Sequence, residues 1–263
     1  MSTKCEQRMR IGRFKQSVTS PAQFGVFDGD AVATANTRSI ELVPDAARDQ
    51  PIAISAVEVL APVTPSKIVC VGRNYREHAA ELGNTIPAEP LLFLKAPSAL
   101  IGNGDCIKLP PESAQVEHEG ELGVVIGKQA HKLAPVDDPL DYVLGYTCVN
   151  DVTARDLQRK DVQFTRAKSF DTFCPVGPWI ETELDPLGLT VTTRVNGSEK
   201  QRGRTADMAF SVPFLVRYIA NIMTLFPGDL IVTGTPAGVS PLKPGDSVAV
   251  EIDGIGILQN SVC

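Results

Sequence analysis

The stretch Val116-Glu117-His118-Glu119-Gly120-Glu121-Leu122-Gly123-Val124-Val125-Ile126-Gly127 decides how the rest of the chain is interpreted. From Glu119 onward the side chains alternate, with Leu122, Val124 and Ile126 on one parity and the two glutamates on the other. A period of two predicts a β-strand with one apolar face. Glu119 and Glu121 then stand on the same face, about 6.6 Å apart at the backbone.

Two carboxylates this close repel each other in a folded protein unless a positive charge lies between them. A solvated strand face is the simpler interpretation of a Glu-x-Glu pair. A third oxygen ligand is available at Asp151, the last residue of the apolar stretch Asp141–Asp151. The set of Glu119, Glu121 and Asp151 predicts a site for a hard cation, with Mg²⁺ first and Mn²⁺ or Ca²⁺ as alternatives. Zinc fits less well, because zinc prefers His and Cys ligands.

The composition is that of a globular protein without a nucleic-acid surface. The 263 residues include 43% hydrophobic and 21% charged residues, and the net charge is −6. There is no basic run of the kind that binds nucleic acid. The amino terminus lacks the apolar core of a secretory signal, and no apolar run is long enough to span a bilayer. We therefore expect a cytoplasmic protein that binds neither nucleic acid nor membrane.

The six cysteines are scattered along the chain, without a Cys-x-x-Cys pair; they are Cys5, Cys70, Cys106, Cys148, Cys174 and Cys263. Several lie in apolar, strand-like surroundings. We expect them to be buried free thiols in a reducing compartment, and neither a disulfide framework nor a zinc site.

The chain divides into a small first part and a larger second part. Residues 1–61 contain short strand patterns, and a proline-punctuated connection around Pro62 leads into the continuously apolar strand Lys67–Gly72. We place a small β-rich domain at 1–61 and a second domain at 62–263. The remaining pattern is β-rich, with helices expected at Arg73–Leu82, Thr153–Lys160 and Ser211–Ile222. The predicted fold class is a mixed, β-rich α+β protein, not a doubly wound sheet.

Two histidines are candidates for a role in the predicted site. His78 and Glu81 are three residues apart on a helix and share a face, so the carboxylate can orient the imidazole as a general base. An ordinary surface pair has the same spacing. The helix precedes a proline-rich loop and could serve as a lid. His118 points to the opposite strand face from Glu119, which favours a packed or exposed histidine.

Lys168 lies between small and apolar residues, where a lysine could stabilise an oxyanion or an acidic substrate. A salt bridge with Asp171 or Asp156 is the alternative, and Lys95 is a weaker candidate for the same role. The small-residue loop Thr233–Gly238 follows a strand, so its N–H groups and the Thr235 hydroxyl could hold a carboxylate or phosphate. A tight turn between strands is the alternative. The loop lacks the ending of a P-loop, so a nucleotide is not indicated.

Taken together, these stretches resemble the fumarylacetoacetate hydrolase family. The resemblance covers about residue 62 to the end, and residues 1–61 resemble the small N-terminal domain of many bacterial members. Its motifs are Val71-Gly72-Arg73-Asn74-Tyr75 with His78, Glu119-Gly120-Glu121-Leu122-Gly123, Asn150-Asp151-Val152-Thr153-Ala154-Arg155-Asp156, Lys168-Ser169-Phe170-Asp171-Thr172-Phe173, Pro175-Val176-Gly177-Pro178 and Gly234-Thr235-Pro236-Ala237-Gly238-Val239.

The resemblance implies a β-roll around a pseudo-barrel, usually in a homodimer, and a small-molecule substrate. It implies metal ligation by Glu119, Glu121 and Asp151, matching the choice made from the residues. It implies catalysis by His78, Glu81 and Lys168. The implied substrate contacts are Arg73, Gln158 and Thr235.

The reaction that the resemblance implies is hydrolysis of a C–C bond in a 2,4-dioxo acid, an acylpyruvate or a fumarylacetoacetate-like compound, through an enolate that the metal stabilises. The same enolate also serves a 2-hydroxyhepta-2,4-diene-1,7-dioate isomerase or an oxaloacetate-type decarboxylase. From other classes, a Schiff-base lyase using Lys168 or Lys95 and a non-catalytic metal-binding protein stay open.

Overall fold

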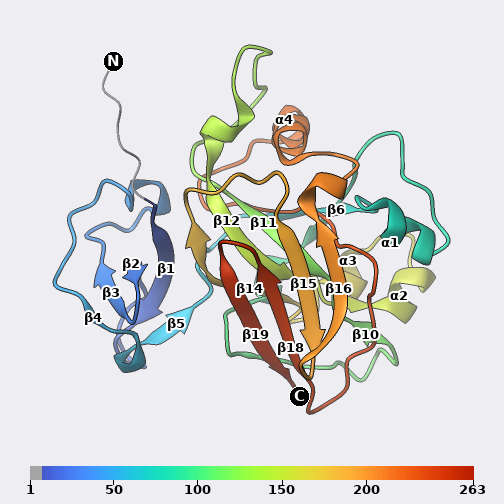
Figure 1. The fold of residues 1–263 in the computed structure, drawn as a ribbon, viewed down its shortest axis with the longest axis horizontal. Coiled ribbons are helices and arrows are strands. Elements are labelled where there is room, and N and C mark those ends of the chain that lie inside the picture. The colour runs from blue at the N-terminus through green and yellow to red at the C-terminus, as the bar shows by residue number, and fades with distance from the viewer. Residues whose placement is uncertain (1–7) are drawn as a thin grey trace.

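The computed structural model describes residues 8–263, whose regular secondary structure is mainly β-strand, arranged in two extended sheets and one short pair (Figure 1). The large sheet contains β1 (Arg10–Lys15), β2 (Gln23–Asp28), β3 (Ala31–Thr34), β4 (Ile52–Ala53), β5 (Glu58–Leu60), β6 (Ile68–Gly72), β7 (Leu91–Lys95), β8 (Leu100–Ile101), β11 (Gly120–Ile126), β12 (Val143–Asn150), β14 (Cys174–Glu181) and β17 (Leu230–Val232). The second sheet contains β9 (Cys106–Ile107), β15 (Thr190–Val195), β16 (Ser198–Arg204), β18 (Ser247–Ile252) and β19 (Gly256–Val262). The short pair is β10 (Val116–Glu117) with β13 (Thr153–Ala154).

Helices are few and short. The α-helices are α1 (Arg76–Glu81), α2 (Arg155–Lys160), α3 (Thr165–Lys168) and α4 (Val212–Ile222). Single 3₁₀ turns occur at Ile40–Leu42, Ile54–Ala56, Pro97–Ala99, Pro139–Tyr142 and Thr205–Asp207. The predicted β-rich α+β class is therefore confirmed. Both extended sheets are open along the part of the chain that the structure describes, with β4 and β7 at the edges of the larger sheet. No helix within residues 8–263 is long and apolar enough to cross a membrane.

Strand β11 lies at the centre of the large sheet, between β12 and β17. Its predicted alternation is observed, but both of its faces are buried. Leu122, Val124 and Ile126 pack into one core cluster together with the apolar face of α4. Val125, on the parity of the glutamates, packs into a second cluster on the other face. The glutamate face of β11 is thus polar only at the start of the strand, where a site can form without interrupting the core.

Helix α1 begins later than predicted, at Arg76 instead of Arg73. Arg73 adopts a left-handed backbone with φ of 57°, and Tyr75 is extended. The side chain of Asn74 holds this turn, because its Nδ2 donates to the Thr233 carbonyl (2.7 Å) and its Oδ1 accepts from the Phe210 N–H (2.8 Å). These tertiary hydrogen bonds outweigh the helix-forming composition of the segment.

The prediction of free cysteines is wrong for two of them. Cys106 and Cys263 form a disulfide that joins the ends of β9 and β19. Cys70, Cys148 and Cys174 are buried free thiols, as predicted, and Cys5 lies outside the described residues. Residues 106 and 263 are 157 positions apart, so sequence spacing carried no indication of their contact.

The first strands join the large sheet instead of forming a sheet of their own. Strand β1 pairs with β2, β5 and β14, and Ile11 faces Ile180 across the β1–β14 pair. Figure 1 shows β1–β5 as a group beside the main body. The division into a 1–61 domain and a 62–263 domain stays a proposal.

Candidate metal centre and active site

A cavity of about 550 Å³ gathers every predicted site residue. They come from the end of β6, from α1, from the start of β11, from the end of β12, from α2 and α3, and from the loop after β17. The residues are Arg73, His78, Glu81, Glu119, Glu121, Asp151, Gln158, Lys168 and Thr235. Segments that are far apart in the sequence thus line one cavity together.

The register of β11 and β12 places the three acids together. Gly120 pairs with Asn150, and the Asp151 N–H donates to the Glu119 carbonyl at 2.8 Å. Ligand oxygens of Glu119, Glu121 and Asp151 all lie within 4.8 Å of one another, and each residue is buried. Glycine is required at Gly120, because a Cβ there would lie 2.0 Å from the Thr193 hydroxyl oxygen.

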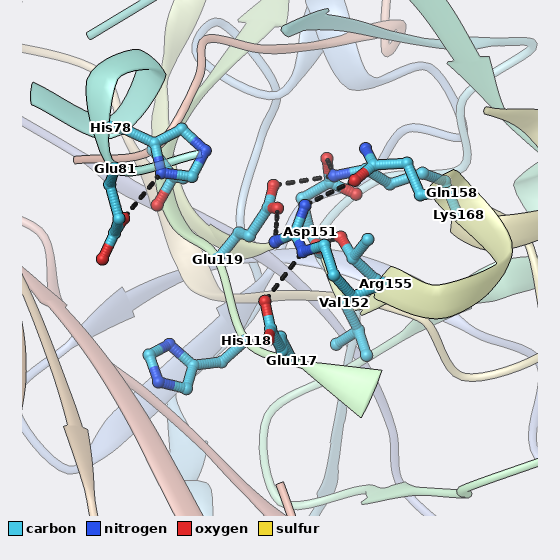
Figure 2. A network of polar contacts seen from close by, with 12 residues as sticks. His78, Glu81, Glu117, His118, Glu119, Asp151, Val152, Arg155, Gln158 and Lys168 are labelled. Carbon is cyan, nitrogen blue, oxygen red and sulfur yellow. Dashed lines mark hydrogen bonds and ion pairs between the residues drawn. The ribbon is translucent and has the colours of Figure 1, made fainter. Parts of the chain in front are cut away.

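Two buried lysines, Lys95 and Lys168, contact these acids, and Figure 2 shows Lys168 beside Glu119 and Asp151. Lys168 Nζ lies 2.7 Å from both Glu119 Oε2 and Asp151 Oδ2, so its partners are neither Asp171 nor Asp156. Lys95, the weaker candidate, is fully buried and donates to Asp151 Oδ1 (2.6 Å) and to the Val152 carbonyl (3.2 Å). Both lysines are therefore part of the acid cluster.

Arg155 is a component of the site to which the sequence assigned no role. Its guanidinium donates to Glu117 Oε2 (2.7 Å), to Glu119 Oε1 and to Gln158 Oε1 (2.6 Å). Arg155 and Gln158 are three residues apart on α2, which is the spacing that places two side chains on one helix face. That spacing was a signal in the sequence, although the pairing with Glu117 and Glu119 was not.

The two glutamates of the pair differ in charge environment. Burial disfavours the charged form of Glu119, but Lys168 and Arg155 outweigh it and hold the pKa of Glu119 below its usual range. Burial raises the pKa of Glu121, and the nearby charges of Asp151 and Glu119 raise it further. Glu121 accepts one hydrogen bond from the Gly234 N–H at 2.5 Å.

The second predicted pair, His78 and Glu81, lies on α1 beside the cavity, apart from the ion-pair network (Figure 2). His78 is buried, and its Nδ1 lies 3.2 Å from Glu81 Oε2. Glu81 also accepts from the Gly238 N–H. His118 points away from the acid cluster, as predicted, and is hydrogen-bonded to Gln201 and Ser240.

The donor set fits a divalent cation. Three carboxylates are the ligand type that Mg²⁺, Mn²⁺ and Ca²⁺ prefer. Burial, and then the neighbouring charges of Asp151 and Glu119, raise the pKa of Glu121, and a cation among the three ligand atoms would offset both effects. Glu119, Glu121 and Asp151 would hold the ion.

Comparisons with known proteins agree with this fold. Residues 67–263 match the family model described as fumarylacetoacetate (FAA) hydrolase C-terminal. The chain is 47% identical to protein Rv2993c of Mycobacterium tuberculosis, over 97% of this chain and 98% of that protein. It is 45% identical to the oxaloacetate tautomerase YisK of Bacillus subtilis, over 80% of this chain and 74% of that protein.

A solved structure is also similar over nearly the whole chain. The 2-hydroxyhepta-2,4-diene-1,7-dioate isomerase of Mycobacterium marinum superposes with a TM-score of 0.84 and 42% identity, covering 97% of this chain and 98% of that one. The relatives just described as a tautomerase and an isomerase are both named as enzymes of small molecules. The chain belongs to the fumarylacetoacetate hydrolase family.

Proposed function

We propose that this protein is a divalent-metal-dependent enzyme that interconverts the keto and enol forms of a short 2-oxo dicarboxylic acid such as oxaloacetate. The observation that carries the proposal is the convergence of a buried acid triad and a His–Glu pair on one cavity. The relative named as an oxaloacetate tautomerase supports the choice of reaction.

The charges around the cavity favour an anionic ligand once a divalent ion is bound. Glu117, Glu119, Glu121 and Asp151 face the three buried cations Lys95, Arg155 and Lys168, which leaves one negative charge in excess when all are ionised. A divalent cation would reverse that sign. A carboxylate would then be attracted to the site.

When bound, the divalent ion supplies Lewis-acid chemistry that lowers the free energy of an enolate. The protein's part is proton transfer. With Nδ1 of His78 engaged by Glu81, Nε2 is the nitrogen left to take a proton from the carbon next to the keto group. The same nitrogen or solvent returns a proton to the keto oxygen to give the enol. The Lys168 ammonium stabilises the negative charge that develops on that oxygen.

A second carboxylate on the substrate would meet further donors that line the cavity. Gln158 Oε1 accepts from Arg155, so the Gln158 amide is oriented with its NH₂ group left to donate. Arg73 also lines the cavity and adopts a strained left-handed backbone, a feature that clusters at functional sites. Arg73 and Gln158 together favour a dicarboxylate over an acylpyruvate with an apolar tail.

The test is the ultraviolet absorbance of enol-oxaloacetate, followed with protein and Mg²⁺ and compared with the spontaneous rate. We expect a faster loss of the enol band that EDTA abolishes and that added Mg²⁺ restores. Oxaloacetate must be recovered intact, because recovery of pyruvate would mean decarboxylation. An enol decay that protein and Mg²⁺ leave unchanged would overturn the proposal.

Replacement of the proposed base separates catalysis from metal binding. We expect His78→Gln to lower kcat by about 100-fold, in the range of general-base contributions, while Mn²⁺ affinity measured by calorimetry stays within about twofold because His78 is not a ligand. His131→Gln is a matched control, since His131 hydrogen-bonds Thr224 and does not line the cavity. A His78→Gln variant with full kcat would remove His78 from the mechanism.

Hydrolysis of a C–C bond in a 2,4-dioxo acid is the second candidate. The family description names a hydrolase, and the His78–Glu81 pair could equally activate water for attack on the distal carbonyl. The same absorbance assay with a small acylpyruvate tests it. Formation of pyruvate and a free acid at a Mg²⁺-dependent rate would support hydrolysis, and a stable enol band would exclude it.

A further inference from the structure

A second buried polar network lies directly behind the cavity wall. Gln201 on β16 and His118 before β11 are both fully buried, and neither lines the cavity. Both hydrogen-bond toward residues that do belong to the site or flank its ligands. The chemistry proposed above makes no use of either side chain.

The Gln201 amide uses all four of its hydrogen-bonding positions. Its Oε1 accepts from the Gly120 N–H (3.0 Å) and lies 3.0 Å from His118 Nδ1. Its Nε2 donates to Thr235 Oγ1 and to the Pro236 carbonyl, each at 2.7 Å. Rotating the amide by 180° would place donors against Gly120 N–H and an acceptor against Pro236 O. Only one orientation satisfies its surroundings.

His118 completes that arrangement from the other side. A neutral ring with its proton on Nδ1 donates to Gln201 Oε1, and its Nε2 then accepts from Ser240 Oγ at 2.8 Å. One tautomer satisfies both contacts. His118 thus supports the amide orientation of Gln201.

The loop Thr233–Gly238, against which Gln201 lies, contacts each part of the site. The Gly234 N–H donates to Glu121, and the Thr235 hydroxyl donates to the Gly120 carbonyl at 2.8 Å. The Gly238 N–H donates to both carboxylate oxygens of Glu81, at 3.1 and 3.2 Å. The loop therefore connects, by hydrogen bonds, the proposed metal ligands and the Glu81 carboxylate that orients His78.

The loop is packed against the backbone of β16 so closely that glycines are needed. A Cβ at Gly238 would lie 2.0 Å from the Lys200 carbonyl oxygen, and a Cβ at Gly203 would lie 2.5 Å from Pro236 Cβ. Gln201 lies between these two contacts. It is the side chain that joins β16, the loop and β11 by hydrogen bonds.

We propose that Gln201 is a positioning residue that holds the Thr233–Gly238 loop in register with β11, and that His118 fixes the orientation of its amide. The inference rests on the proposed use of the cavity for a 2-oxo acid. If so, loss of Gln201 should weaken binding of the 2-oxo acid at the Thr233–Gly238 loop more than it weakens binding of the metal.

The test uses two variants and two binding probes. Gln201→Leu removes all four hydrogen bonds, whereas Gln201→Glu keeps an acceptor for the Gly120 N–H and loses the amide donors to Thr235 and Pro236. Mn²⁺ alone, and then oxalate added to the Mn²⁺-loaded protein as a mimic of a 2-oxo acid enolate, are titrated by calorimetry. We expect oxalate affinity to fall about tenfold in both variants, the effect of one or two lost hydrogen bonds. Mn²⁺ affinity of Gln201→Glu stays within about threefold of the unchanged protein.

Gln259→Leu is the matched control, because the Gln259 amide donates to Ser247 at the exposed face of the second sheet; it should leave both affinities unchanged. Gln201→Leu combined with Thr235→Val should cost less than the two single losses added, since both act through the same loop. Circular dichroism confirms folding, and Gln201→Glu carries the test where the leucine variant does not fold.

Oxalate affinity at the level of the unchanged protein in folded Gln201 variants, or full additivity with Thr235→Val, would overturn the proposal. The readout is binding, so it is separate from the proposed reaction. A protein that binds Mn²⁺ and oxalate but leaves enol-oxaloacetate untouched would refute the tautomerase and still report on Gln201. A Mn²⁺-loaded protein that binds no oxalate would overturn both the proposed use of the cavity for a 2-oxo acid and the role of Gln201 that rests on it.

Discussion

Glu119 and Glu121 share one strand face yet play different electrostatic parts. Glu119 forms ion pairs with Lys168 and Arg155, whereas Glu121 is buried beside like charges and accepts a backbone N–H. Removing one partner of a buried ion pair leaves an uncompensated charge, which is strongly destabilising. Removing a charge that is already repelled does not carry that cost. Substitutions of Glu119 and Glu121 should therefore change the free energy of unfolding differently, although both residues are proposed metal ligands.

In metal-free protein, we expect Glu119→Gln to lower the free energy of unfolding by about 3 kcal/mol. We expect Glu121→Gln to leave it unchanged or to raise it by up to about 1 kcal/mol, because like-charge repulsion is relieved. Urea denaturation in EDTA measures both, with the exposed Glu58→Gln as the control. Both site variants should lose Mn²⁺ binding. Equal destabilisation by the two substitutions would show that the charge assignment is wrong.

At the scale of elements, the last strand is held at its end by a covalent bond. Strand β19 pairs in parallel with β9, and the Cys106–Cys263 disulfide joins their ends. The bond closes a loop across 157 positions of sequence, so in the unfolded state it removes much conformational freedom. The acid triad lies on the other sheet, on and beside β11 and β12.

We therefore expect a reductant to lower the free energy of unfolding by about 2–4 kcal/mol while Mn²⁺ affinity stays unchanged. Denaturation with and without dithiothreitol measures the first quantity, and calorimetry the second. Cys106→Ser is the control: it should show the lower stability already, and dithiothreitol should have no further effect. An intact protein that does not respond to the reductant would contradict a stabilising disulfide.

At the scale of the whole molecule, the first strands are built into the large sheet although no proposed site residue comes from them. Ile11 on β1 is fully buried in the core cluster that includes Val176 and Ile180 of β14. Phe27 on β2 lies with its ring centroid 6.3 Å from that of Trp179, also on β14. The first strands thus pair with β14 and pack against its side chains, which stabilises the large sheet.

We expect a chain of residues 62–263 to bind Mn²⁺ as the full protein does. Its free energy of unfolding should be about 3 kcal/mol lower, because loss of buried apolar contacts of this kind has a cost of that order. Urea denaturation and calorimetry measure the two properties. Ile11→Ala in the full chain should reproduce part of the loss. A folded 62–263 chain without Mn²⁺ affinity would show that the first strands shape the site and would contradict the proposed division at residue 61.

The parts of the fold that were predicted correctly are those with a local cause. The period of two in β11, the apolar run of β6 and the proline-led helix α4 depend on neighbours within a few residues. The start of α1 was misplaced because Asn74 bonds to Thr233 and Phe210, which are more than 130 residues away.

Local sequence patterns predict that two carboxylates share a strand face and that a third acid ends another apolar strand, and this set of ligands suits a hard cation. The cations that face those acids are set by the packing of distant segments. Lys95, Arg155 and Lys168 meet Glu119 and Asp151 through the register of β11 on β12 and the placement of α2 and α3. The same holds for Gln201 behind Thr235 and for the Cys106–Cys263 bond. Side-chain alternation is fixed by the local geometry of one strand, whereas contacts between distant segments depend on how the whole chain packs, which no local pattern records.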